Sequence, residues 1–239
     1  MRIRIIRPVS SAAPNSAIEE QFRPYASPGT EVLAEKIRNG PSSVESRYDV
    51  AMAATGVVEC ALVAQSEGFD ACIVNCFADP GLGAAREVVR IPVVGAGESA
   101  MLLAASLGAT IGIITVASAL RAVLLENARA IGLADKITSI SAVDIPVREL
   151  GDRGRLLTQL KDQALTAVKK HGAHVLVLGC TGMTGTAASL HEAILEATGL
   201  DVPVVDPVGA AMALAEGLAR MRIAHSALSY CRPPHKMAT

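Results

Sequence analysis

The sequence predicts an α/β protein of two similar lobes related by a pseudo-twofold axis. Each lobe is expected to contain a mainly parallel four-stranded sheet flanked by helices. Composition is the first reason: 51% of the 239 residues are hydrophobic, but only 3% are aromatic and none is Trp, as in sheets that helices cover on both faces. The second reason is that one pattern of segments occurs twice along the chain.

The repeat is clearest in two pairs of segments. Residues 92–101 read PVVGAGESAM and residues 203–212 read PVVDPVGAAM, at an offset of 111 residues. The run GFDACIVNC ends at Cys76 and the run GAHVLVLGC ends at Cys180, at an offset of 104 residues. In each run a glycine precedes an apolar strand that ends at a cysteine, so both halves should carry this strand at the same place in their sheets.

The other strands are assigned in chain order. The first half opens with a strand at residues 2–6, and a second strand is expected at residues 30–37. The second half opens with a strand at residues 110–115, and its second strand is expected at residues 139–144. Each opening strand is followed by a turn-rich stretch and a helix, which is the alternation that a parallel sheet requires.

The repeat also sets the predicted domain boundaries. Residues 1–97 should form the first lobe and residues 98–208 the second. Residues 209–239 should form a C-terminal segment whose helix, at residues 210–221, packs back on the first lobe. Because ligands of open parallel sheets bind beyond the carboxyl ends of the strands, the active site is expected between the lobes.

Charge and cysteine content argue against several classes of protein. With 22 basic and 23 acidic residues the net charge is −1, so no basic field is available for a nucleic acid. The five cysteines are an odd number in a chain that is not short, which disfavours a disulfide framework. The opening residues MRIRIIRPVSS contain too short an apolar run for a signal peptide, and a cytoplasmic protein is expected.

One uncharged run could be mistaken for a membrane span. Residues 99–120 contain no charged side chain over 22 positions, which is long enough to cross a bilayer. Gly108 and Gly112 interrupt it, and the run divides naturally into a helix and a short strand. We therefore expect no membrane partner, while the mean hydropathy of +0.38 favours a homo-oligomer.

Cys76 and Cys180 differ from the other three cysteines because they occupy equivalent places at strand ends. Cys60, on a helix, and Cys72, inside a strand, are interpreted as small buried hydrophobic residues, and Cys231 as an incidental thiol near the C-terminus. If the two halves face each other, the thiols of Cys76 and Cys180 should flank one cleft.

A facing pair of thiols has several possible uses. A disulfide is disfavoured in a cytosolic cleft, and no cluster of His or carboxylate ligands stands near enough in the sequence for a metal site. A nucleophilic cysteine usually needs a histidine base, and neither cysteine has one beside it. Acid–base chemistry remains: a thiolate removes a proton from one face of a carbon and a thiol delivers one to the other, as in a two-base racemase.

Glycine-rich turns follow both cysteines. FADPGLG comes after Cys76 and TGMTG after Cys180. We expect the free backbone N–H groups of these turns, backed by the helix that follows, to lower the thiol pKa and to stabilise an enolate oxygen. A plain helix cap on a glycine-rich turn is the alternative interpretation of the second motif.

At these residues the chain resembles the aspartate/glutamate/hydantoin racemase superfamily, and in particular its hydantoin racemase branch, which includes allantoin racemases. The resemblance extends over almost the whole chain. It rests on GPSSVESRYD from Gly40, IVNCFADPGL from Ile73, IPVVGAGESAM from Ile91, IGIITV from Ile111, VLGCTGM from Val177 and VPVVDPVGAAM from Val202.

The resemblance implies a racemase of 5-substituted hydantoins that needs no metal and no pyridoxal phosphate. A small hydantoin-like molecule would be its partner, and the reaction would transfer a proton through an enolate. Carried over by motif, Cys76 and Cys180 are the two acid–base groups. The substrate-binding residues that it implies are Pro8, Val9, Val44, Phe77, Ala78, Thr115, Thr181 and Gly182.

The chain departs from the pattern of that branch at three places around the expected ligand. The first strand runs into Arg7 followed by PVS, where N-P-N-[ST] is common, so two amides are lost. Val116 stands where a second threonine is common, and Asn75 precedes Cys76 where a small apolar residue is usual. The departures leave the catalytic pair better defined than the substrate.

Other substrates therefore remain as alternatives. A neutral, planar hydantoin needs hydrogen-bond partners but no cation, whereas free aspartate or glutamate would need a carboxylate site. Arg7 could provide that site if its side chain enters the cleft, or it could be an ordinary exposed arginine. Allantoin racemase and aspartate/glutamate-type racemase are thus alternative functions.

The paired cysteines also argue against two other functions. A decarboxylase of the malonate type shares this fold but typically keeps one catalytic cysteine, so the pair argues against it. A non-catalytic, two-lobed binding protein for small molecules would have no need of matched thiols.

Overall fold

The structure is a computed structural model that describes residues 1–11 and 13–234. Residue 12 of the predicted first lobe and residues 235–239 of the predicted C-terminal segment lie outside the described residues. The strands are β1 (Arg2–Arg7), β2 (Glu31–Lys36), β3 (Ala71–Val74), β4 (Val93–Gly95), β5 (Ile111–Thr115), β6 (Ile137–Ala142), β7 (Val175–Leu178) and β8 (Val204–Val205).

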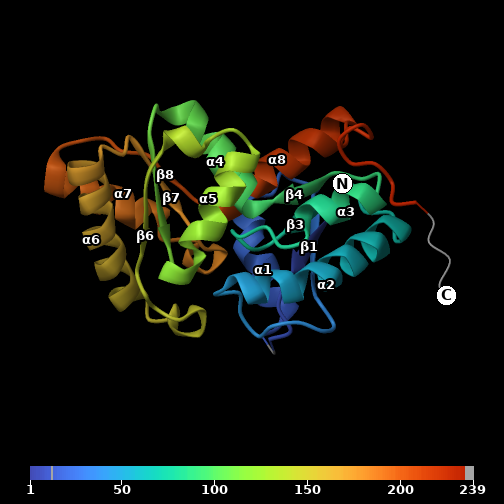
Figure 1. Ribbon diagram of the computed structural model, residues 1–239. Helices are drawn as coiled ribbons and strands as arrows, with labels where there is room; N and C mark the ends of the chain where they lie inside the picture. Colours follow the sequence, from blue (N-terminus) through green and yellow to red (C-terminus); the bar gives the residue numbers. More distant parts are fainter. Residues whose placement is uncertain (12, 235–239) are drawn as a thin grey trace.

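These strands form two four-stranded sheets, one in each lobe (Figure 1). The strand orders are β2-β1-β3-β4 and β6-β5-β7-β8, and every pairing is parallel. The same order in both sheets reflects the repeat in the sequence. The predicted fold class, with two four-stranded parallel sheets flanked by helices, is confirmed.

The strands expected at residues 30–37 and 139–144 both exist. The first is β2, which is one residue shorter at each end. The second is β6, which begins and ends two residues earlier than expected. It ends early because Asp144 has a φ of 50°, in the left-handed region that no strand residue adopts.

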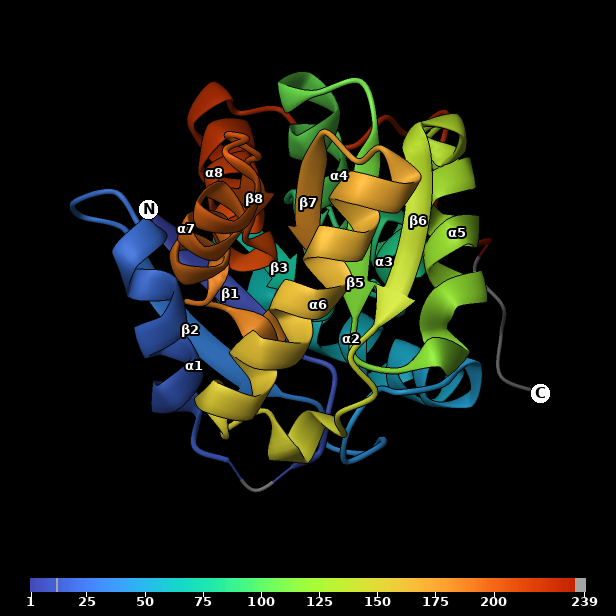
Figure 2. The same ribbon diagram turned by 90° about the vertical axis from the view of Figure 1, so that its left-hand side faces the viewer.

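Eight helices cover the sheets of the described chain in three-layered lobes. They are α1 (Asn15–Phe22), α2 (Arg47–Ser66), α3 (Leu82–Val88), α4 (Ala96–Leu107), α5 (Arg121–Ala130), α6 (Arg153–His171), α7 (Ala187–Thr198) and α8 (Pro207–Met221). In the first lobe, α2 and α3 pack on one face of the sheet and α1 and α8 on the other. In the second lobe, α6 and α7 cover the outer face and α4 and α5 the other (Figure 2).

Two of these helices are exchanged between the lobes. Helix α4 follows β4 of the first sheet but packs against β5 and β7 of the second. Helix α8 follows β8 of the second sheet but packs against β3 and β4 of the first. The two helices also contact each other between the lobes (Figure 1). Each sheet is therefore covered on one face by a helix that directly follows the last strand of the other sheet.

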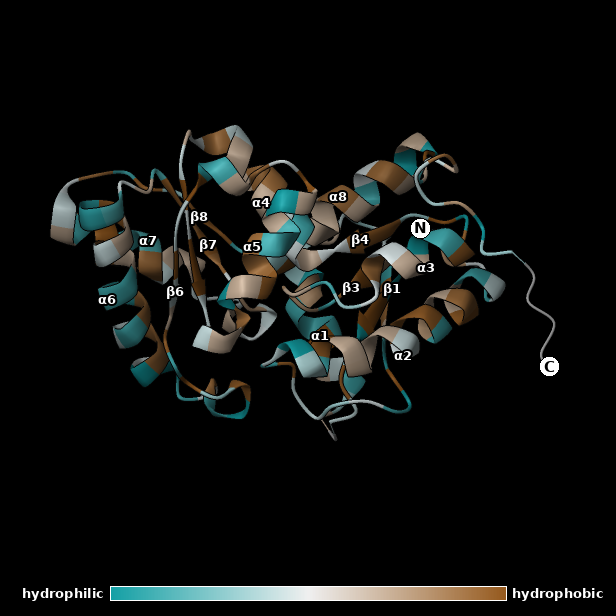
Figure 3. Cartoon of the chain, viewed as in Figure 1, coloured by the Kyte–Doolittle hydropathy of each residue, from teal (hydrophilic) through white to brown (hydrophobic). Residues whose placement is uncertain are grey.

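Strand β3 shows how the sequence buries both faces of a sheet. Ala71 and Ile73 face α8 and pack with Met212, while Cys72 and Val74 belong to the opposite core cluster. All four strand residues are fully buried, as expected for a parallel strand without polar alternation. Strands β3 and β7 are accordingly brown in Figure 3, whereas the outer helix α6 carries hydrophilic residues.

Helix α2 is the one helix of the described chain that is long and apolar enough to cross a membrane. Helices in the cores of globular proteins also meet this criterion of length and composition. Here α2 packs against β1 and β3, and Val57, Ala61 and Ala64 on it are fully buried. The uncharged run at residues 99–120 divides between α4 and β5, as its glycines indicated.

Candidate active site

Cys76 and Cys180 line the same cavity, which has a volume of about 350 Å³ and lies between the lobes. Each thiol stands two residues beyond the end of a buried strand, β3 for Cys76 and β7 for Cys180. Both residues are partly exposed, whereas Cys60 and Cys72 are buried. The fold thus brings the two cysteines together from segments that lie 104 residues apart.

The backbone before Cys180 is packed closely against β5. A Cβ atom on Gly179 would lie 2.9 Å from the carbonyl oxygen of Ile114, so the close approach of the two strands requires glycine here. The hydroxyl of Thr115 donates a hydrogen bond of 3.2 Å to the carbonyl oxygen of Gly179. These contacts fix the position from which Cys180 projects.

The turn after Cys180 presents an N–H group to the thiol. Residues Thr181–Met183 form one turn of 3₁₀ helix, and the N–H of Gly182 donates to the Cys180 sulfur at 3.3 Å. Helix α7 begins only at Ala187. The expected helix end behind this thiol is therefore replaced by a short turn.

The loop after Cys76 is held in place by Asp79. This residue has a φ of 50°, and its carboxylate accepts hydrogen bonds from the N–H groups of Gly97 (3.0 Å) and Glu98 (2.7 Å) in the first turn of α4. A Cβ atom on Gly95 would lie 2.5 Å from the carboxyl carbon of Asp79. The carboxylate thus occupies the space that a side chain at position 95 would need, and it caps α4.

Five of the eight predicted substrate-binding residues line the cavity together with the cysteines. They are Pro8, Val9, Val44, Thr181 and Gly182. Thr181 also connects the two halves, because its hydroxyl donates to the carbonyl oxygen of Asn75 at 3.4 Å.

The other three predicted residues do not line the cavity. Phe77 and Ala78 are 2% and 4% exposed and belong to the core. The carbonyl oxygen of Ala78 accepts a hydrogen bond of 3.0 Å from Asn127 on α5. Thr115 is fully buried behind Gly179. Phe77 and Ala78 belong to the loop that follows Cys76, and Thr115 holds the residue before Cys180, so their side chains lie behind the cavity wall.

Sequence reasoning missed part of the wall. Ser42 and Ser43 line the cavity beside Val44, and their place in the motif GPSSVES was the signal that could have identified them. Val147 and Arg148, from the loop before α6, carry no comparable local signal. The remaining lining residues are Arg7, Ser11, Ala13, Ile18, Gln21 and Asn75.

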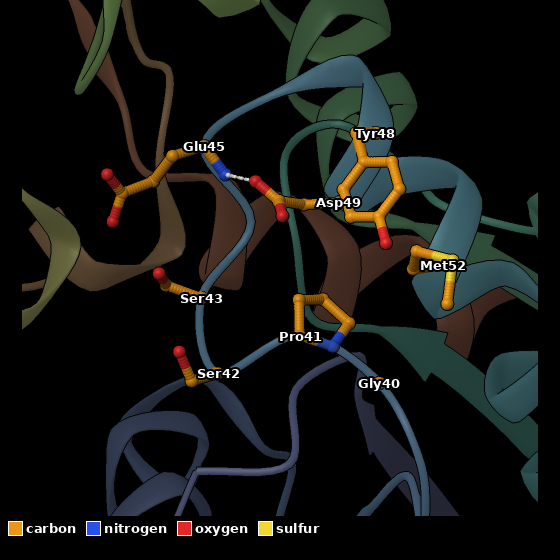
Figure 4. Close-up of a pocket in the computed structure, with 8 residues that line it drawn as sticks. All are labelled: Gly40, Pro41, Ser42, Ser43, Glu45, Tyr48, Asp49 and Met52. Atoms are coloured by element: carbon orange, nitrogen blue, oxygen red, sulfur yellow. Dashed lines mark hydrogen bonds between the residues drawn. The ribbon is translucent and has the colours of Figure 1, made fainter.

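The loop at residues 40–45 separates this cavity from a second hollow of about 420 Å³. Ser42 and Ser43 line both. In Figure 4 their side chains and that of Glu45 lie on one side of the loop, whereas Tyr48 and Met52 lie on the other, on the first turns of α2. The loop therefore forms one wall of the cysteine cavity.

Glu45 connects this loop with the second lobe. Its N–H donates to the carboxylate of Asp49 at 3.1 Å (Figure 4), and Ser46 caps α2 by accepting from the N–H of Asp49. The carboxylate of Glu45 accepts a hydrogen bond of 3.1 Å from the N–H of Val147. The first lobe's loop and the second lobe's loop thus meet beside Cys180.

Burial dominates the acidity of the two thiols. It raises the pKa of Cys76 to about 12, and the charges of Cys180 and Asp79 add to this increase, while hydrogen bonds to the backbone of Ala78 and Asp79 lower the pKa. The lowering that the sequence led us to expect from turn N–H groups is present, but the desolvation of a thiolate in this cavity is larger.

Cys180 is in a similar environment. Its pKa is raised to about 11: burial is the main cause, hydrogen bonds to the backbone of Gly182 and Met183 oppose the increase, and the charge of Glu45 adds to it. Among residues 1–11 and 13–234, no group of three or more His, Cys, Asp or Glu side chains is arranged to hold a metal ion.

The family of the chain follows from its sequence as a whole. The profile of the family described as Asp/Glu/Hydantoin racemase matches residues 3–215. The chain belongs to this family. It is therefore a racemase, an isomerase that inverts the configuration at a carbon atom.

Relatives of this racemase share its full length. A hydantoin racemase from Paenarthrobacter aurescens is 35% identical over 239 residues, which cover 99% of each chain. The solved structure of an allantoin racemase from Klebsiella pneumoniae is 33% identical, with a TM-score of 0.91, and covers 100% of this chain and 96% of that one. These matches confirm the resemblance to the hydantoin racemase branch.

A more distant relative shares the fold alone. The structure of a glutamate racemase isoform from Bacillus anthracis is 19% identical, with a TM-score of 0.66, and covers 92% of this chain and 82% of that one. The two-lobed architecture is thus shared with a protein of widely different sequence.

Proposed function

We propose that the protein racemises 5-substituted hydantoins without a cofactor, with Cys76 and Cys180 as its two acid–base groups. The observation that carries this proposal is that two thiols, at equivalent strand ends of different lobes, line one cavity. The full-length similarity to a hydantoin racemase supports the choice of substrate class.

In the proposed reaction the ring binds with its C5 carbon between the two sulfur atoms. One cysteine, as a thiolate, takes the C5 proton; the electron pair of the C–H bond forms a double bond to the adjacent carbonyl carbon, and the carbonyl π pair moves onto its oxygen to give an enolate. The other cysteine, as a thiol, delivers its proton to the opposite face of C5. The two cysteines exchange protonation states, and the reverse sequence converts the other enantiomer.

The remaining residues of the cavity would hold the ring. We assign to Thr181 and Gly182 the polar contacts with the ring carbonyls, and to Pro8, Val9 and Val44 the apolar contacts. Phe77, Ala78 and Thr115 would act from behind, by holding the loops that carry the thiols. Small displacements of these loops should lower the rate of racemisation, because proton transfer requires hydrogen-bond distances between the sulfur atoms and C5.

Allantoin racemisation is the second candidate, and the allantoin racemase structure supports it. Allantoin is a hydantoin with a ureido group at C5, so the same two-base reaction applies. Racemisation of free aspartate or glutamate is the third, and it differs because the substrate is acyclic. Cytoplasmic location and a homo-oligomeric state stay predictions.

Polarimetry tests the proposal directly. One enantiomer of a 5-alkylhydantoin, of allantoin and of glutamate is incubated with reduced enzyme at about pH 8, and the loss of optical rotation is followed. We expect the hydantoin to lose rotation. If only glutamate does, or if no substrate does, the proposed substrate class is wrong.

Single substitutions test the role of the cysteine pair. Cys76→Ser and Cys180→Ser should each abolish racemisation, while one variant still exchanges the C5 hydrogen of one enantiomer in deuterated solvent. Cys60→Ser, which removes a buried thiol outside the cavity, is the matched control. Full racemisation by either of the first two variants contradicts the two-base reaction.

A further inference from the structure

Arg7 is a buried charge in the wall of the cysteine cavity. It is the last residue of β1 and is only 3% exposed, and it lines the cavity with Cys76 and Cys180. The sequence left open whether this side chain enters the cleft. It does, at the position where the hydantoin branch commonly has an asparagine.

The partners of the Arg7 guanidinium are neutral. Nη1 donates to the carbonyl oxygen of Ala13 (2.8 Å) and to the side-chain oxygen of Asn15 (2.6 Å), and Nη2 donates to the hydroxyl of Ser11 (3.2 Å). No carboxylate of residues 1–11 or 13–234 forms an ion pair with Arg7. A buried guanidinium without a counter-charge is unfavourable, and burial lowers the pKa of Arg7 accordingly.

The thiols do not supply the counter-charge. The hydrogen bonds of the Arg7 guanidinium go to Ala13, Asn15 and Ser11, and none of them goes to the sulfur of Cys76 or Cys180.

The rest of the cavity wall has no acidic side chain. Besides Arg7, its one ionisable residue other than the cysteines is Arg148, an exposed arginine of the second lobe, and neither Asp, Glu, Lys nor His lines it within the described chain. The two arginines of the wall come from different lobes, and the nearby carboxylate of Glu45, which does not line the cavity, accepts a hydrogen bond from the N–H of Val147. A neutral hydantoin gives no reason for the positive charge of the two arginines, whereas an anionic substituent would complement it.

We propose that Arg7 determines specificity by binding a carboxylate on the C5 substituent, so that the preferred substrates are hydantoins with an acidic side chain. The inference rests on the proposed function and names its substrate class. Arg7 has five N–H donors, of which the three contacts above use three, and the others are the ones that we assign to the substrate. Pro8, Val9, Ser11 and Ala13, which follow Arg7 in the chain, line the same wall.

A pair of substrates of equal size tests this assignment. For the wild-type enzyme, kcat/KM for 5-(2-carboxyethyl)hydantoin should exceed that for 5-(2-carbamoylethyl)hydantoin by at least about 10-fold, the effect of one charge-assisted hydrogen-bonded pair. An equal or higher value for the neutral amide overturns the proposal, whatever happens to any variant.

Arg7→Gln separates recognition from a structural role. The variant should lose the preference for the acid, so that the ratio of kcat/KM for the acid to kcat/KM for the amide falls to about 1, whatever loss the two substrates share. An equal loss for both substrates, which leaves that ratio unchanged, would mean that Arg7 only holds its loop, and it overturns the proposal. Arg38→Gln, which removes an exposed arginine outside the cavity, is the matched control and should keep the preference.

Binding distinguishes a failure of this inference from a failure of the proposed function. If the wild-type enzyme racemises neither compound, the dissociation constants of both are measured by calorimetry. Tighter binding of the acid that Arg7→Gln abolishes supports the role of Arg7, although the proposed function is then wrong. Equal binding of acid and amide contradicts the role of Arg7.

Discussion

Cys76 and Cys180 occupy equivalent places, but their surroundings differ. Asp79 and Cys180 place negative charge near Cys76, and Glu45 places it near Cys180. The pKa of both thiols is raised above the ordinary value of a cysteine, mainly because burial disfavours the charged thiolate. The thiol is therefore the favoured form of either cysteine at neutral pH.

The first prediction concerns pH. Since the base must lose a proton before it can act, and since burial raises both thiol pKa values to about 11 and about 12, kcat/KM should increase as the pH rises from about 7 to about 10. The alkylation rates of Cys76 and Cys180 by iodoacetamide, measured by mass spectrometry, should increase over the same range. A pH-independent rate of alkylation would contradict the raised pKa values without reference to any substrate.

Glu45 is the subject of the second prediction. Its negative charge raises the pKa of Cys180, so Glu45→Gln should lower that pKa and move the rising part of the pH profile to lower pH. Glutamine keeps an oxygen that can accept from the N–H of Val147, which limits the change to charge. Glu59→Gln, an exposed carboxylate on α2, should leave the profile unchanged. A profile that moves to higher pH in Glu45→Gln would show the assignment to be wrong.

The sequence identified the cysteine pair because the repeat placed both thiols at strand ends. It identified Val44, Thr181 and Gly182 through motifs that surround the cavity. It could not identify Val147 or Arg148, because they come from a loop whose position depends on contacts such as that with Glu45. Thr115 was assigned to the cavity, but its side chain turns toward Gly179, and the direction of a side chain at a strand end is not encoded locally.

At the scale of elements, each cysteine loop is attached to the start of an exchanged helix through one carboxylate. In the first half the loop supplies Asp79, which caps α4 where Gly95 has no side chain. In the second half the helix supplies Asp206, which accepts from Thr184 (3.1 Å) and Gly185 (3.0 Å) of the loop and also caps α8. Gly95 and Asp206 are equivalent in the repeat, so the carboxylate has a different origin in each half.

Gly97 gives the third prediction. A Cβ atom there would lie 2.0 Å from the carbonyl oxygen of Phe77, so Gly97→Ala must displace the loop that carries Cys76. We expect it to lower the free energy of unfolding by about 2 kcal/mol or more and to lower kcat by a larger factor than Cys60→Ser. The measurements are urea unfolding and racemisation kinetics.

A glycine in the preceding helix, α3, provides the matched control for Gly97→Ala. Gly83 in α3 has nothing within 4 Å of an added Cβ atom, so Gly83→Ala should be neutral or stabilising by up to about 1 kcal/mol through helix propensity. If the two substitutions have equal effects on stability, the contact with Phe77 does not constrain the loop.

For the whole molecule, the two lobes do not have separate cores. One cluster of buried residues contains Val74 and Met101 as well as Val177 and Leu190, and it extends through both sheets. Helix α8 is fixed to the first lobe by Glu216, whose buried carboxylate accepts from the N–H of Ser27 at 2.8 Å. The lobes should therefore unfold in a single transition.

The fourth prediction follows from the exchange of α8. A chain that ends at Asp206 loses the helix that covers Ile5 and Ile73, and burial of such side chains contributes roughly 1.5–3 kcal/mol each. We expect this chain to aggregate or to lack a cooperative unfolding transition, as measured by size-exclusion chromatography and circular dichroism. A chain that ends at Arg232 keeps α8 and should fold. A truncated chain that stays monomeric and folded would contradict the role of α8.

The exchange of α8 also determines when the protein can fold during its synthesis. The first sheet is complete once β4 has been made, but Ile3, Ile5 and Ile73 lack their covering helix until Met212 has left the ribosome. The core of the first lobe therefore cannot be completed, and one apolar face of its sheet stays open to solvent, while the second half is translated. A ribosome that pauses between residues 110 and 200 would therefore expose that face for as long as the pause lasts.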